Sequence, residues 1–364
     1  MNKIILSVIV CCVSVLGFSQ SKNVQNAYNS FRQEKFEEAK KFIDMAYNHE
    51  QTANDPKMWN YRAQIYLEIM KKHSELDINA AFKATEAHIK CLQKDSKGRI
   101  AVRKWTREED VLNGLVQCGH NLYNTAIGDY QNENYLLSIK KNKELFKIFP
   151  LDKDHLLKRI NIFPVTIYYS IYLSSIELND VDMQIEYLQK LIDLNMNANV
   201  YKYMSNIYIE KGDLEKALDY IQQGKEMFDD DNLLIHSEID LYLKMKKPNS
   251  EIIEILTDAI ELDDLNEILF IIRAQRYIEE NMYNLAERDL LTALDLEPSS
   301  KTANNNLASL YLTKTEPLVN ELNELSYSDK SKREVLNLKI NELKIHSLPY
   351  LIAYTESEPT DKAA

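Results

Sequence analysis

The chain has 364 residues, with only 7 glycines and 8 prolines, and 45% of its residues are hydrophobic. So few turn-forming residues argue against sandwiches, barrels and doubly wound α/β folds, while the apolar content argues against disorder. The net charge of −12 argues against binding to the phosphate backbone of nucleic acid, which requires clustered Lys and Arg. The composition therefore predicts a long, helix-dominated protein.

The N-terminus has the features of an export signal. A basic start is followed by an apolar run over residues 4–18, too short to span a bilayer, and Gly17 and Ser19 are small residues before Gln20. We expect a signal peptide over residues 1–19, cleaved near Ser19. Cys11 and Cys12 leave lipoprotein processing as an alternative. The mature chain is then exported, periplasmic or associated with the cell envelope, with no transmembrane segment and 43 basic against 56 acidic residues.

Beyond this signal, amphipathic stretches of about three turns alternate with short breaks, which predicts antiparallel helix pairs. In chain order the pairs cover Ala27–Ala46, Trp59–Cys91, Leu122–Pro150, Tyr168–Leu191, Val200–Asp230, Leu234–Asp263, Glu267–Pro298 and Leu307–Pro359. A coiled coil is the competing helical interpretation, but strict heptads do not continue across the breaks.

The pairs share a repeated residue pattern with a period of about 34 residues. A large aromatic residue, a small residue and a tyrosine mark the first helix, and alanines mark the second. The clearest copies are Tyr201-Ser205-Tyr208-Gly212-Ala217 and Phe270-Ala274-Tyr277-Ala286-Ala293-Pro298. This pattern resembles the tetratricopeptide repeat (TPR), in particular exported TPR proteins of Gram-negative bacteria. The resemblance implies an all-α fold, a right-handed superhelical solenoid of about eight antiparallel helix pairs.

The regularity of the pattern varies along the chain. We expect N-terminal helix pairs over residues 20–96, irregular pairs over 97–163, and a C-terminal array over 164–364. A charged helical insertion is expected at about 313–346 within the last unit, followed from Ser347 to Pro359 by a stretch that resembles the second repeat helix of that unit.

The sequence carries no recognisable catalytic motif. The 7 histidines are scattered, and H-E-x-x-H, Cys-x-x-Cys and glycine-rich phosphate loops are missing from the sequence. Cys118 and His120 are two residues apart and face different directions on a helix. The acidic stretch 229–231 lacks the spacing of a calcium loop and is interpreted as a solvated turn. We expect no enzyme, no cofactor and no metal; Cys91 and Cys118 form either a disulfide or two buried thiols.

The TPR resemblance also implies a binding surface, because the fifth, ninth and twelfth positions of each first helix face a groove. These positions hold Lys202, Asn206 and Ile209, then Ile271, Gln275 and Ile278, then Asn305, Ser309 and Leu312. Lys202 with Asn206 resembles half of a clamp for a peptide carboxylate. The other half is missing, because Tyr203 replaces an Asn, and Leu234 and Glu238 occupy the basic positions. Tyr172, Tyr201, Tyr208 and Tyr277 are expected in the core, and Tyr169 and Tyr203 as surface contacts.

These features predict a non-enzymatic scaffold that binds a protein or peptide in the cell envelope. The alternative is an accessory subunit of an outer-membrane assembly or carbohydrate-uptake complex. In that case the charged insertion after Tyr311 would be the docking element.

Overall fold

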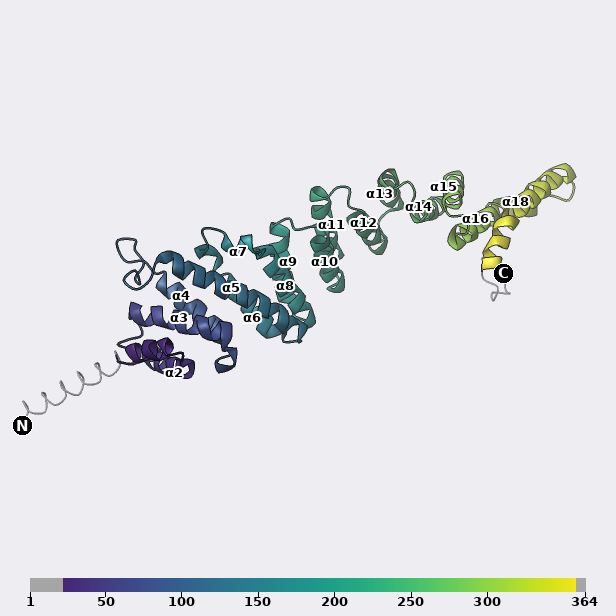
Figure 1. Ribbon diagram of the computed structural model, residues 1–364. Helices are drawn as coiled ribbons and strands as arrows, with labels where there is room; N and C mark the ends of the chain where they lie inside the picture. The colour runs from purple at the N-terminus through teal and green to yellow at the C-terminus, as the bar shows by residue number, and fades with distance from the viewer. Residues whose placement is uncertain (1–21, 358–364) are drawn as a thin grey trace, which may run out of the picture. The chain divides into compact units, whose positions relative to one another are not determined.

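The computed structural model describes residues 22–357 (Figure 1). In this range the chain is helical between turns and irregular loops, and strand-type pairing is limited to one isolated bridge between Lys94 and Ile100. The predicted all-α fold is confirmed for these residues. The predicted signal peptide lies outside them. The chain divides into two compact units, unit 1 up to Met196 and unit 2 from Asn197 onward.

From residue 22 onward, unit 1 contains four helix pairs in succession. Residues 22–32 form the first helix, and the others are α2 (Phe36–Tyr47), α3 (Pro56–Lys72), η1 (Ser74–Leu76), α4 (Ala80–Cys91), α5 (Glu108–Gln131), α6 (Tyr135–Leu145), η2 (Phe149–Leu151), α7 (Leu156–Arg159), α8 (Pro164–Glu177) and α9 (Val181–Asp193). The helices pack within the pairs α3/α4, α5/α6 and α8/α9. Each pair also packs on the next, through α2 with α3, α4 with α5, and α6 with α8.

Unit 2 repeats this arrangement with four further pairs. Its helices are α10 (Ala198–Glu210), α11 (Leu214–Met227), α12 (Asn232–Lys244), α13 (Asn249–Leu262), α14 (Glu267–Glu279), α15 (Tyr283–Leu296), α16 (Lys301–Thr313), α17 (Glu316–Glu324) and α18 (Lys330–Ser357). The pairs are α10/α11, α12/α13, α14/α15 and α16/α18. The first helices of neighbouring pairs also touch, α10 with α12 and α14 with α16.

The residues of the repeat pattern form the interior of both units. Tyr172, Tyr201 and Tyr208 are buried, and Tyr277 is partly buried against the core of unit 2. The small residues have no exposed surface, which lets neighbouring helices approach closely. They are Ala27, Ala39, Ala46, Ala84, Ala126, Ala217, Ala274, Ala286 and Ala293.

The break between α10 and α11 shows how the sequence ends one helix and begins the next. Gly212 has a φ of +79°, in the left-handed region that suits glycine after a helix end. Asp213 then caps α11, because its carboxylate accepts a hydrogen bond from the backbone N–H of Lys216 at 3.1 Å. The two helices therefore reverse direction within a few residues.

Gly224 allows the close contact between α11 and its neighbours. An added Cβ would lie 2.9 Å from Tyr201 Cβ and Cγ and 3.0 Å from Leu234 Cδ1. We expect Gly224→Ala to lower the free energy of unfolding by about 1–3 kcal/mol, because overpacking outweighs the better helix propensity of alanine. Urea denaturation measures the change. The matched control is Gly128→Ala in α5, where the added Cβ meets nothing within 4 Å and should be neutral or stabilising. Equal effects of the two substitutions would contradict the close contact.

The last helix differs from the sequence prediction. We expected an insertion to about His346 and a separate repeat helix from Ser347, but α18 is one helix that packs on α16 and α17. Pro349 lies inside it and removes one backbone donor, which bends a helix without ending it when packing holds both sides. Figure 1 shows α18 changing direction toward its C-terminal end.

Candidate functional site

The structure places most of the predicted groove residues at the surface of unit 2. Asn206 is exposed and Lys202 and Ile209 are half-buried on α10, where their spacing puts them on one helix face. On α16, Asn305, Ser309 and Leu312 are exposed, and on α14, Gln275 and Ile278 are half-buried. Ile271 is only 6% exposed and belongs to the core.

The helix between these positions, α12, contributes residues that the sequence analysis missed. Counting 34 residues on from Lys202 and Asn206 leads to His236 and Asp240, and both are exposed. Because α10 packs directly on α12, these four side chains belong to neighbouring first helices. The 34-residue period would have identified them.

The structure also shows the role of Leu234 and Glu238, which occupy the positions of the second half of a carboxylate clamp. Leu234 is fully buried, and Glu238 is 5% exposed. Glu238 accepts hydrogen bonds from Lys225 and from Gln222 (3.3 Å) on α11. Its carboxylate therefore ties α12 to α11 and is unavailable to a ligand. We define a first-helix face, which consists of the surface positions on the first helices of unit 2. Its residues are Lys202, Asn206 and Ile209 on α10, His236 and Asp240 on α12, Gln275 and Ile278 on α14, and Asn305, Ser309 and Leu312 on α16.

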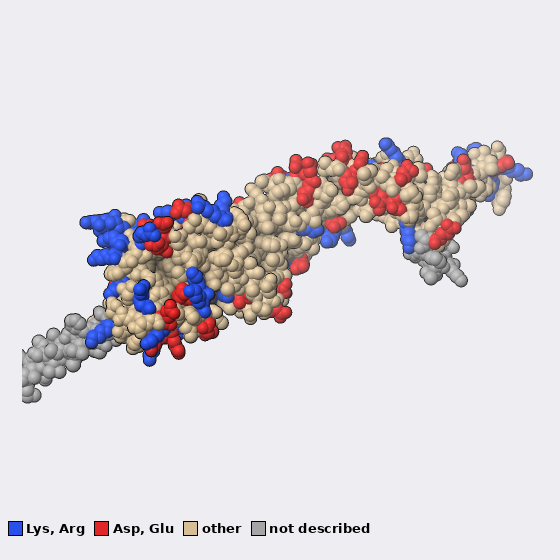
Figure 2. Space-filling view, in the orientation of Figure 1, with Lys and Arg blue, Asp and Glu red and all other residues tan. Residues whose placement is uncertain are grey.

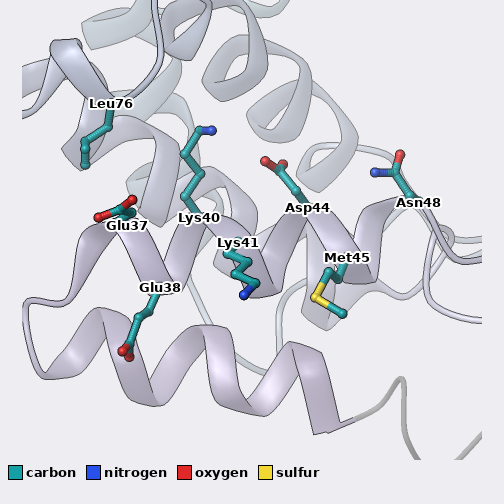
Figure 3. Close-up of a pocket in the computed structure, with 8 residues that line it drawn as sticks. All are labelled: Glu37, Glu38, Lys40, Lys41, Asp44, Met45, Asn48 and Leu76. Atoms are coloured by element: carbon teal, nitrogen blue, oxygen red, sulfur yellow. The ribbon is translucent and has the colours of Figure 1, made fainter.

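In unit 1, a pocket of about 610 Å³ lies beside α2 and is lined largely by charged residues (Figure 3). Lys40 and Asp44 point from α2 toward neighbouring helices, whereas Glu38, Lys41 and Met45 point the other way in this view. The lining residues are Glu37, Glu38, Lys40, Lys41, Asp44, Met45, Asn48 and Leu76.

The central charges of this pocket are already used in packing. Asp44 accepts hydrogen bonds from Arg62 at 2.7 Å and from Tyr66 at 2.7 and 2.8 Å. Lys40 lies 3.5 Å from Asp77, a residue outside the pocket lining that also contacts Lys83 at 2.8 Å. Burial alone would raise the pKa of Asp77, but hydrogen bonds from Lys83 and from the backbone outweigh burial and lower that pKa. We interpret this network as the junction of α2, α3 and α4.

Cys91 and Cys118 are free, buried thiols, which settles the choice left open by the sequence. Burial raises the pKa of Cys91 and of Cys118 to about 12. Cys118 Sγ lies 3.9 Å from Nδ1 of His88, whose pKa burial lowers to about 4. Both partners are therefore uncharged at neutral pH, unlike a reactive thiolate–imidazolium pair. His120 is exposed and bonds Asn124, away from Cys118.

Within residues 22–357, no group of three or more His, Cys, Asp and Glu side chains is arranged to hold a metal ion. In the acidic stretch before α12, Asp231 caps the helix by accepting hydrogen bonds from the backbone of Leu233 and Leu234 at 3.0 and 3.3 Å. The helices of this same range are all too short or too polar to cross a membrane.

Comparison with known proteins gives similarity to solved structures only. A scan against protein-family models and a search of curated proteins found no match. A crystal structure of the MamA protein is 14% identical, covering 54% of this chain and 93% of that chain, with a TM-score of 0.39. MamA from Desulfovibrio magneticus RS-1 is 10% identical, covering 54% and 97%, with a TM-score of 0.37. YrrB, described as a TPR protein with an unusual peptide-binding site, is 15% identical, covering 50% and 88%, with a TM-score of 0.35.

The internal evidence for the repeat comes from the chain itself. Tyr201, Ile235, Phe270 and Asn304 occupy one buried position of four successive first helices, and Ser205, Ile239, Ala274 and Ala308 occupy the next. Unit 2 is therefore a stack of helix pairs with the same buried positions in each first helix. One side of each first helix is used for packing, and the first-helix face lies at the surface.

Proposed function

We propose that the protein is a non-enzymatic scaffold that binds a peptide segment of a partner protein on the first-helix face of unit 2. The observation that carries this proposal is that α10 and α16 each alternate between buried positions and positions at the surface. Their pattern residues are buried, while Lys202, Asn206, Asn305 and Ser309 lie at the surface at equivalent positions.

The chemistry of this face suits an extended or helical peptide. Amide, hydroxyl and ammonium groups can bond a peptide backbone, and Ile209, Ile278 and Leu312 offer apolar contact between them. The helices that carry these groups are fixed by their buried sides, so little ordering is needed on binding. We also propose, from the N-terminal sequence, that this binding takes place in the cell envelope.

A second candidate function is an accessory subunit that docks on a protein of an envelope complex through α18. This helix is apolar on two opposite sides. Leu336 and Ile340 are 6% and 5% exposed, whereas Leu338 and Ile345 are 64% and 65% exposed. The exposed row consists of Val335, Leu338, Ile345, Leu348 and Ile352. The solvent-facing side of a helix is normally polar, so this exposed apolar row favours a protein contact.

One affinity-purification experiment tests both candidates. The tagged full-length protein is recovered from the native envelope as wild type, as K202E/N206A, and as L338K/I345K. Peptide binding on the first-helix face predicts that K202E/N206A recovers roughly tenfold less partner, as loss of one or two central contacts does. Docking through α18 predicts the same loss for L338K/I345K.

The matched control is R288E/T292A, which makes a charge reversal and a truncation at the same spacing on the exposed side of α15. It should recover as much partner as wild type, and thermal unfolding should be nearly unchanged in all variants. A partner retained by both test variants, or lost equally by the control, would contradict both candidates.

A further inference from the structure

The loop between α4 and α5 concentrates positive charge in an acidic chain. We define residues 92–107 as the basic loop, which carries six cationic residues and one acidic residue, Asp95, while the whole chain has a net charge of −12. The six are Lys94, Lys97, Arg99, Arg103, Lys104 and Arg107. Figure 2 shows Lys and Arg gathered where Figure 1 shows this loop, at the upper left of the view.

The backbone of the basic loop is held in one shape. Asp95 Oδ1 accepts hydrogen bonds from the backbone N–H groups of Lys97 (2.9 Å) and Arg99 (3.0 Å). The bridge between Lys94 and Ile100 closes the turn. Ile100 and Val102 anchor the loop, since they are only 4% and 0% exposed. The cationic side chains therefore extend from a preorganised base.

The arginines of this loop already hold carboxylates. Arg107 donates from Nε and one Nη to the two oxygens of Asp110, at 2.9 and 2.8 Å. Arg99 donates in the same way to one oxygen of Asp95, at 3.3 and 3.1 Å, and Arg103 lies 3.1 Å from that oxygen. These ion pairs are well exposed to solvent and contribute little to stability, so an incoming carboxylate can replace the internal one.

The same arginines surround a pocket of about 630 Å³ that also contains an aromatic ring. Arg99, Arg103 and Arg107 line it together with Trp105, a residue that is 40% exposed. Glu108 and Asp110, in the first turn of α5, also line it. Tryptophan and arginine are the residues most enriched where protein interfaces have their largest binding energies. A concave site of this kind admits carboxylate side chains, whereas a flat bilayer surface would reach only its rim.

We propose that the basic loop binds an acidic segment of a protein partner, with Asp or Glu carboxylates in the arginine forks and an apolar side chain against Trp105. This site lies in unit 1 and is separate from the first-helix face of unit 2. It therefore adds a second binding surface to the proposed function.

The test uses the full-length protein and a fluorescein-labelled peptide of alternating Glu and Asp with two leucines, followed by fluorescence polarisation. We expect R99Q/R103Q to weaken binding at least about tenfold, since it removes charge-assisted hydrogen bonds. We expect W105A, which leaves the charge unchanged, to weaken it about threefold or more. Circular dichroism checks that each variant is folded.

The matched control is K158Q/R159Q, which removes the same two charges from exposed positions on α7 of the same unit. It should bind within about twofold of wild type, allowing for a general charge effect screened by salt. K202E/N206A should also bind normally, which separates a failure here from a failure of the proposed function.

Three results would overturn the proposal. One is an equal loss in R99Q/R103Q and K158Q/R159Q, which would mean general charge attraction. Another is no detectable binding of the peptide to the wild-type protein. The third is binding to vesicles of phosphatidylglycerol and phosphatidylcholine in place of the peptide, which would assign the loop to a lipid surface.

Discussion

Replacing Asp289 with alanine is expected to lower the free energy of unfolding by about 3–5 kcal/mol, because it leaves a buried guanidinium without its partner. Asp289 on α15 accepts two hydrogen bonds from Arg273 on α14, at 2.7 and 2.9 Å. Arg273 also donates to Thr257 Oγ1 on α13 at 3.1 Å. The side chains of Arg273 and Asp289 are 13% and 6% exposed, so water replaces little of the lost interaction.

Urea denaturation followed by circular dichroism measures this loss. The control is Glu186→Ala, which removes one member of the exposed pair Lys190–Glu186 (2.7 Å) and should change stability by at most about 0.5 kcal/mol. The double variant R273M/D289L should recover much of the stability, since a buried ion pair can be replaced by apolar residues of similar volume. A cost below about 1 kcal/mol for Asp289→Ala would contradict the pair's role in joining α13, α14 and α15.

Acid is expected to destabilise unit 1 through His88. Burial lowers the pKa of this imidazole from 6.5 to about 4, and its Nδ1 lies 2.7 Å from the carbonyl oxygen of Ala84. The ring also fills the space beside Gly114, where an added Cβ would lie 2.2 Å from Nε2. Between pH 6.5 and 4 the unfolded chain binds a proton that the folded chain does not. Stability is therefore complete above pH 6.5 and falls as the pH decreases toward 4, by about 3 kcal/mol in all.

The measurement is urea denaturation of wild type and His88→Leu across this pH range. The variant keeps an apolar side chain at the site, so the part of the pH dependence that His88 causes should disappear, whatever its stability at neutral pH. Identical pH profiles for the two proteins would contradict an uncharged, buried His88. A direct check is the NMR signal of the imidazole, which should keep its neutral position down to about pH 5 and reach the midpoint of its titration only near pH 4.

The sequence predicted the helix pairs because the pattern of the repeat is set by local spacing. Tyr201, Ser205 and Ala217 are each buried, since a helix turns about 100° per residue and the apolar side must face a neighbour. The end of α10 is also set locally, because Gly212 readily adopts the positive φ that follows the end of a helix. Features of this kind depend on a few consecutive residues and can be found without a structure.

Buried charge could not be predicted in the same way. From the sequence, Glu238 was placed at a basic position of the carboxylate clamp and Asp289 had no assigned role. As whole residues they are only 5% and 4% exposed. Their burial depends on Lys225 and Arg273, 13 and 16 residues away and on another helix. Pairing across helices decides such positions, and local spacing does not contain that information. Ile271, predicted for the groove, was buried by packing for a similar reason.

The net charge of the whole chain, −12, does not reveal the basic loop. Its cations are close in sequence, but Trp105 and Arg99 are brought to one pocket only by the turn that Asp95 and the buried Ile100 and Val102 hold in place. The local run of Lys and Arg can be read from the sequence, but the folded conformation of the basic loop cannot.

Site-specific photo-crosslinking tests the central claim, peptide binding on the first-helix face, most directly. A benzophenone amino acid is placed at Asn206 on α10, at Ser309 on α16, or at Arg288 on the exposed side of α15, all of them exposed positions. The account predicts covalent adducts with the partner in the native envelope from Asn206 and Ser309, and none from Arg288. Adducts from Arg288, with none from the other two positions, would contradict it.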